Sequence, residues 1–213
     1  MRPTPRRAPR GRCGGLQLFG HDDAMSFTDD RQRLLPAPTI RLATSEDIPV
    51  LQELIDRSAR GLGPGYYTAA EIESAAHHVF GVDSTLIADR TYFVAERDGV
   101  VVGCGGWSHR RTLYGGDQRP VGGAELLDPQ REPARIRAFF VAPEAARRGI
   151  GRHLLAHCEE AARRAGFASL ELMSTLPGVP FYTALGFVEV EEVIDTMPDG
   201  MPLRFIRMRR DMV

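Results

Sequence analysis

The chain contains 213 residues, 43% of them hydrophobic, which is enough for one substantial core but hardly for a second full domain. Its formal net charge of −1 and its pI near 6.6 argue against a general role in binding nucleic acids or membrane surfaces. No apolar run is long enough to span a bilayer.

The first 37 residues are rich in arginine, proline and glycine, so we expect a disordered leader before a single domain over residues 38–213. This leader has neither the apolar stretch nor the amphipathic face of a targeting peptide. Met25 is a second candidate for the start of translation. An alternative is that the leader contacts nucleic acid, and it ranks low because the rest of the chain carries no basic excess.

The remaining residues alternate between strand and helix patterns. A strand over 39–43 precedes a helix capped by Thr44 or Ser45, and Asp98-Gly99 is typical of a hairpin turn. The other predicted elements, in chain order, are a helix over 69–79, strands over 91–96 and 100–107, a polar insert over 108–133, a strand over 135–141, a helix from 150 to Gly166, a strand over 170–174, a short helix, and strands over 187–193 and 203–208. Together they predict an α/β fold, in which a mixed sheet has helices on both faces.

The most informative stretch is Val141–Leu155, where a strand leads through a glycine-bearing turn into a helix. Gly149 and Gly151 let backbone amides approach a ligand closely, and the first amides of a helix have no intrahelical acceptor. They also lie at the positive end of the helix dipole. Three arginines flank the turn: Arg147, Arg148 and Arg152. The turn is therefore a candidate phosphate site.

The spacing of this turn excludes two common nucleotide motifs. No Gly-Lys-Ser/Thr follows, and Leu154 stands at the third glycine position of a Rossmann fingerprint. The stretch instead resembles the acetyl-CoA-binding motif of the GCN5-related N-acetyltransferase (GNAT) superfamily. The shared residues are Val141, Pro143, Gly149 and Gly151. Ala146 departs from the motif, which has Gln or Arg there, although Arg147 beside it could serve instead.

A second segment, Pro180–Phe187, is similar to the Phe-Tyr-x-x-x-Gly-Phe segment of the same family. The resemblance runs from about Pro38 to the C-terminus. It implies splayed fourth and fifth strands with the pantetheine arm of acetyl-CoA between them. The implied contacts to the donor come from Phe139, Phe140 and Val141 for pantetheine, and from Arg147, Arg148, Gly149, Ile150, Gly151 and Arg152 for the diphosphate.

The activity that the resemblance implies is direct acetyl transfer to a primary amine of a small-molecule acceptor, without a metal or an acyl-enzyme. Tyr182 is the candidate proton donor to the departing thiolate. It could instead position the sulfur or simply pack as an aromatic residue. A non-catalytic acyl-CoA-binding module is the alternative function, and the resemblance leaves homodimer formation open.

The general base is not evident, because the strand where relatives often carry a glutamate has Arg135 and Arg137. Candidate replacements are Glu96, His109, Glu125 and Glu171. We hypothesise that Arg137 holds an acceptor carboxylate, although a salt bridge with an acid of the insert is favoured. The insert is expected to determine which acceptor is bound. The stretch 174–178 stands where many relatives place an asparagine that contacts the cofactor arm.

Other residues with chemical potential have structural explanations that we favour. His153 and His157 stand four apart on one helix, but no zincin glutamate accompanies them. Cys104 lacks an evident histidine partner and is expected to be buried. Trp107 either lines the acceptor pocket or closes the end of the core. Three cysteines without metal-ligand spacing predict a reducing cytoplasm, and a composition without lysine or asparagine is typical of a GC-rich bacterial genome.

Overall fold

The chain divides into two units, residues 1–35 and 36–213. The computed structural model describes residues 36–119 and 125–212, all of which belong to the second unit. The expected leader therefore lies almost entirely outside the described residues, and its disorder stays a prediction. Within the described part of the chain, no helix is both long and apolar enough to cross a membrane.

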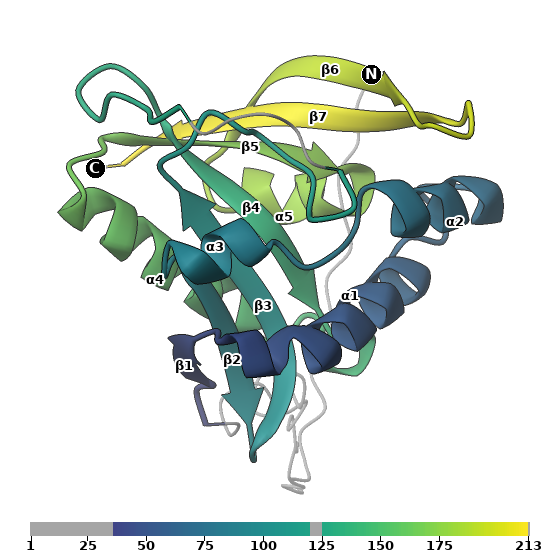
Figure 1. Ribbon diagram of the computed structural model, residues 1–213, viewed down its shortest axis with the longest axis horizontal. Helices are drawn as coiled ribbons and strands as arrows, with labels where there is room; N and C mark the ends of the chain where they lie inside the picture. The colour runs from purple at the N-terminus through teal and green to yellow at the C-terminus, as the bar shows by residue number, and fades with distance from the viewer. Residues whose placement is uncertain (1–35, 120–124, 213) are drawn as a thin grey trace, which may run out of the picture. The chain divides into compact units, whose positions relative to one another are not determined.

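A seven-stranded mixed sheet forms the centre of this unit, in the order β1-β2-β3-β4-β5-β7-β6 (Figure 1). The strands are β1 (Thr39–Leu42), β2 (Tyr92–Arg97), β3 (Val100–Ser108), β4 (Ala134–Val141), β5 (Ser169–Thr175), β6 (Val188–Thr196) and β7 (Pro202–Asp211). Only β4 and β5 pair in parallel, and the other neighbours are antiparallel. The predicted mixed sheet is confirmed.

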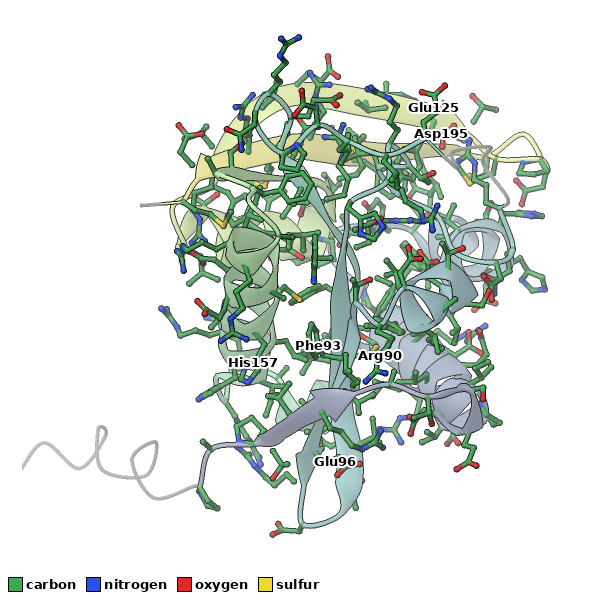
Figure 2. The ribbon with its side chains drawn as sticks, turned by 60° about the vertical axis from the view of Figure 1, so that its left-hand side comes forward. Arg90, Phe93, Glu96, Glu125, His157 and Asp195 are labelled. Carbon is green, nitrogen blue, oxygen red and sulfur yellow. The ribbon has the colours of Figure 1, made fainter. Side chains whose placement is uncertain are left out.

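Helices cover both faces of the sheet, as predicted. They are α1 (Ile48–Leu62), α2 (Ala69–His78), α3 (Ser84–Ala88), α4 (Ile150–Arg164) and α5 (Val179–Thr183), with 3-10 turns η1 (Ser45–Asp47), η2 (Pro143–Ala145) and η3 (Leu176–Gly178). Figure 2 shows the sheet nearly edge-on, with α4 on one side and α1 to α3 on the other. Helix α3 was not predicted, because its five residues are too few to show an apolar period.

Helix α4 packs on the sheet through the apolar stripe that its sequence predicts. Its fully or almost fully buried residues are Ile150, Leu154, Leu155, Cys158 and Ala162. Ala165, expected on the same face, is exposed because the helix ends at Arg164. Gly103 on β3 allows the close approach, since a Cβ there would lie 2.8 Å from Ile150 Cγ2. The start of α4 is thereby held against the sheet.

The β2–β3 hairpin turns at the predicted dipeptide. Asp98 and Gly99 have φ values of 52° and 75°, which is the backbone of a turn with two left-handed central residues. This geometry matches the right-handed twist of the strands, so the turn directs β3 back along β2.

Strands β4 and β5 diverge soon after they meet. Their parallel pairing covers only Ala134 to Ile136 of β4, opposite Leu170 to Leu172 of β5. Beyond that point β4 continues beside β3 to Val141, with an irregularity around Ala138, whose φ is 51°. The predicted splay is therefore present, and the edge of β4 facing β5 has no ladder partner from Arg137 onward.

Candidate active site

The turn before α4 exposes a set of unengaged backbone donors. Arg147 and Gly149, the N-cap of α4, have φ values of 63° and 81°. None of the amides from Arg147 to Arg152 donates to a described residue. A left-handed arginine costs about 1–2 kcal/mol, a cost that is common at ligand sites. The geometry suits an anion at the helix N-terminus.

The cations around this turn are also unengaged. Arg147, Arg148 and Arg152 are exposed and make no ion pair with any residue that the structure describes. Glu144, the acid that precedes the turn, pairs with Arg57 at 2.6 Å. The positive charge at the start of α4 is therefore not neutralised within the described chain, which favours a polyanionic ligand.

The unpaired edge of β4 leads directly into this turn. The Ala142 amide donates to Val102 O on β3 at 2.9 Å, so the alternation of a strand places the Val141 amide on the β5 side. That amide has only a long contact, 3.4 Å, to the Ser58 hydroxyl of α1. The Phe140 amide faces β3, where Phe140 pairs with Cys104 in the ladder. By the same alternation the Phe139 amide also lies on the β5 side, so of the three predicted pantetheine contacts Phe139 and Val141 direct their amides toward the gap.

Tyr182 lies on α5, which follows β5 and the turn η3 in the chain. Its ring packs between Phe139 and Phe187, with ring centroids 6.5 and 5.5 Å away. The hydroxyl has no hydrogen-bond partner among the described residues. Burial raises the pKa of Tyr182 well above its ordinary value of 10, so the phenol keeps its proton at neutral pH.

The two predicted motifs meet in space. A Cβ added to Gly151 at the start of α4 would lie 3.0 Å from the ring of Phe181 on α5. Gly151 therefore lets α5 pack against the phosphate-site helix. Since Tyr182 follows Phe181, this contact fixes the candidate proton donor relative to the turn, although the two motifs are about thirty residues apart in sequence.

The four candidate bases all have partners. Glu96 pairs with Arg41, Glu125 with Arg111 and Glu171 with Arg135, and His109 lies 3.8 Å from Asp89. Glu96 and Glu125 also lie at opposite ends of this unit (Figure 2), so they cannot serve one site. The base stays unassigned among the described residues.

Arg137 forms a buried ion pair. Its Nη2 lies 2.8 Å from Asp83 Oδ2 and donates to Gly115 O at 2.6 Å, and the two charged side chains are 6% and 4% exposed. Burial lowers the pKa of Arg137 and raises that of Asp83. The salt bridge that we favoured exists, but its acid comes from the α2–α3 connection, and the insert supplies only a carbonyl. The guanidinium is already engaged.

Burial accounts for two other residues singled out in the sequence, and local hydrogen bonds account for two more. Cys104 is fully buried, and burial raises the pKa of its thiol to about 12, so it carries no thiolate at neutral pH. Trp107 is 6% exposed and packs edge-on against Phe167, so it closes the core. His153 and His157 each place Nδ1 2.9 Å from a backbone carbonyl of α4 or its cap.

One residue of the site region gave no signal in the sequence. The Tyr67 hydroxyl donates to Arg204 O at 2.6 Å and accepts from the Leu176 amide at 3.0 Å. It joins the α1–α2 connection to β7 and to η3, the turn that precedes α5. Burial raises the pKa of Tyr67 to about 12, so this hydroxyl stays a donor. A lone tyrosine after the Gly-Pro-Gly break has no pattern that would reveal these partners.

Comparisons with known proteins agree with this geometry. The model of the acetyltransferase (GNAT) family matches residues 58–187. The IAA acetyltransferase of Azospirillum brasilense is 27% identical over 164 residues, which cover 76% of this chain and 90% of that protein.

Two solved structures share the fold. A GCN5-related N-acetyltransferase from Rhodopseudomonas palustris has a TM-score of 0.64 at 18% identity, covering 84% of this chain and 98% of that one. The protein yncA of Salmonella typhimurium, solved with its cofactor acetyl-CoA, has a TM-score of 0.56 at 18% identity, covering 84% of this chain and 95% of that one.

Proposed function

Because the chain belongs to the acetyltransferase (GNAT) family, whose members use acetyl-CoA as acyl donor, we propose that it transfers the acetyl group directly to a primary amine of a small-molecule acceptor. One observation carries the proposal. The unengaged amides from Arg147 to Arg152 and the unpaired edge of β4 are consecutive in the chain and adjoin the helix of Tyr182. This continuity matches a ligand with a diphosphate, an extended amide-bearing arm and a reactive end.

In this proposal the donor lies along the gap. The amides at the start of α4 bind the diphosphate, and the flanking arginines balance its charge. The Val141 amide, whose only described contact is 3.4 Å long, pairs with the pantetheine arm. Buried donors without good partners are costly, so a ligand that satisfies them is stabilised there.

The chemistry requires few groups from the protein. The neutral amine nitrogen attacks the thioester carbonyl carbon, so that a C–N bond forms and the C–S bond breaks. The Tyr182 hydroxyl gives its proton to the leaving sulfur, and the proton lost by the amine restores the phenol through water. Burial keeps the phenol protonated before transfer but also makes it a weaker acid, so in this proposal the proton moves only as negative charge develops on the leaving sulfur.

Two measurements test the proposal on the full chain. Calorimetry with coenzyme A should detect binding, and thiol release from acetyl-CoA with a panel of amines should detect turnover. Absence of coenzyme A binding would refute the donor site. Binding without turnover of any amine would identify the alternative, a non-catalytic acyl-CoA-binding module.

Tyr182→Phe tests the proton donor. The substitution keeps the ring that packs beside Phe139 and removes a hydroxyl without a described partner, so we expect unchanged coenzyme A affinity and a kcat lower by about 10²-fold or more. Tyr66→Phe is the matched control, because Tyr66 is 49% exposed. Equal kcat values for the two variants would refute the role of Tyr182.

We also propose a bacterial source and a cytoplasmic location. The support for the location is the state of the two described cysteines, Cys104 and Cys158, which are both free and buried. Disulfides are rare in reducing compartments, so unpaired thiols are expected there.

A further inference from the structure

Residues 114–119 of the insert, here called the strap, are fixed to the β4 half of the sheet. The carbonyl of Gly115 accepts from Arg137 of β4 at 2.6 Å. Asp117 Oδ1 accepts from the amide and the hydroxyl of Ser84 at 3.0 and 2.8 Å, and the Asp117 amide donates to Val82 O at 2.9 Å. These contacts hold one side of the strap to β4 and to the start of α3.

The strap is fixed to the other half of the sheet through Asp195 of β6. The Tyr114 hydroxyl donates to Asp195 Oδ2 at 2.7 Å, and the Arg119 guanidinium donates to both carboxylate oxygens, at 3.1 Å to Oδ1. Arg119 also lies 5.3 Å from the centre of the Tyr114 ring. The side chain of Asp195 is only 14% exposed, and Figure 2 shows it beside the β6–β7 end of the sheet.

These contacts cross the place where the sheet divides. Arg137 belongs to β4. Asp195 belongs to β6, which pairs with β7, and β7 in turn pairs with β5. Beyond Ile136 no ladder joins β4 to β5. The strap therefore links the two halves by side chains, on the face opposite α4. An amine that reaches the gap from this face passes the strap.

The side of the strap that meets the sheet is apolar. The Tyr114 ring packs on Phe205 of β7 with centroids 5.7 Å apart, in a cluster that also contains Met173 and Met201. The charged groups of the strap are already engaged, Arg119 by Asp195 and Asp117 by Ser84. Phe205 is itself buried, whereas Tyr114, Met173 and Met201 are only partly buried, so an incoming acceptor would meet aromatic and thioether surface from these three residues.

We propose that the Asp195 contacts hold the strap as one wall of the acceptor site, and that this wall selects primary amines carried on an apolar body, such as arylalkylamines. Asp195 is in this view a positioning residue that acts through Tyr114 and Arg119. The inference rests on the proposed function, because it presumes that an amine is acetylated in the gap.

Asp195→Asn tests the inference in the full chain, with Glu192→Gln as the matched control. Glu192 lies on the same strand, and its carboxylate is half exposed and 3.9 Å from Arg204. The acceptor probes are phenylethylamine, glutamate and spermidine. We expect the wild type to prefer phenylethylamine and Asp195→Asn to lose about tenfold in kcat/KM for it, through KM of the amine. KM for acetyl-CoA should stay unchanged in both variants.

Hydrogen exchange supplies a readout that does not depend on turnover. The amides of residues 114–119 should exchange faster in Asp195→Asn than in Glu192→Gln, while coenzyme A still binds both. Normal amine kinetics or unchanged exchange in Asp195→Asn would overturn the inference alone, as would a wild-type preference for glutamate or spermidine. A wild type that binds coenzyme A but acetylates no amine would overturn the proposed function, and this inference with it.

Discussion

Replacing Arg137 with methionine should leave a buried carboxylate without its counterion. Arg137 and Asp83 are 6% and 4% exposed, so neither charge can be solvated by water in place of its partner. Removing one member of such a pair costs about 3–5 kcal/mol. For a domain whose stability is about 5–15 kcal/mol, this is a large fraction. We therefore expect Arg137→Met to be severely destabilised in urea unfolding.

A double-mutant cycle separates the charge from the packing. Asp83 also caps α3, since its Oδ1 accepts from the Leu86 amide at 3.3 Å, and Asn at this position keeps an acceptor there. Arg137→Met combined with Asp83→Asn should recover most of the loss, because no buried charge remains. Arg90→Met, at an exposed arginine whose side chain has no described partner, should change stability by about 0.5 kcal/mol or less.

The loss of stability in Arg137→Met should also depend on pH. Burial raises the pKa of Asp83, and loss of Arg137 raises it further, so the folded single variant binds a proton more readily than its unfolded chain. The loss of stability relative to the wild type is therefore complete above the raised pKa, and it narrows as the pH falls through that pKa toward the unfolded value of 3.8. A double variant as unstable as Arg137→Met, or a single variant within about 1 kcal/mol of the wild type, would refute this reasoning.

Two further predictions concern the turn and the first strand. Gly149→Ala should cost about 1–2 kcal/mol in urea unfolding, because φ is 81°, and should also weaken coenzyme A binding in calorimetry. Gly99→Ala, at a φ of 75° in the hairpin, should cost a similar amount without affecting coenzyme A, and equal affinities would contradict a donor site at the turn. Hydrogen bonds from Arg41 lower the pKa of Asp47 from 3.8 to about 2. This pair should therefore contribute about 2 kcal/mol to the free energy of unfolding. The contribution is present above pH 4 and is lost as the pH falls toward 2. Asp47→Asn should remove this dependence in thermal melts followed between pH 6 and 3, and parallel curves for both proteins would contradict it.

The sequence was sufficient where a structure depends on the backbone of a few neighbouring residues. The hairpin was predicted because Asp-Gly is typical of a two-residue turn, and the turn at Gly149 because a residue without Cβ lets backbone amides approach a ligand. In the structure Asp98, Gly99 and Gly149 all have left-handed φ values. The stripe of α4 was predicted because a helix repeats every 3.6 residues. Its end was misplaced by one residue, so Ala165 was assigned to the core although it is exposed.

The partners of side chains could not be predicted in the same way. Asp83 and Arg137 are 54 positions apart, and the pattern around each says only that a charge is present. The same holds for Asp195 and Tyr114, which meet only because the β6–β7 hairpin returns to the sheet beside the insert. A pairing of this kind depends on the topology, which local periodicity does not contain.

The width of the gap between β4 and β5 depends on contacts between side chains that are far apart in the sequence. The backbone joins the two halves over three residue pairs, from Ala134 to Ile136 of β4. Beyond them the halves are connected by the strap and by the hydroxyl of Tyr67, which bonds η3 and β7. On the opposite face, α5 packs against Gly151 of α4. Arg137 is an exception, because its buried ion pair with Asp83 also supports the global stability. At the other links, Tyr114, Asp195 and Tyr67, we infer that substitutions change ligand binding in the gap before they change the global stability, which rests on the core beneath the strands.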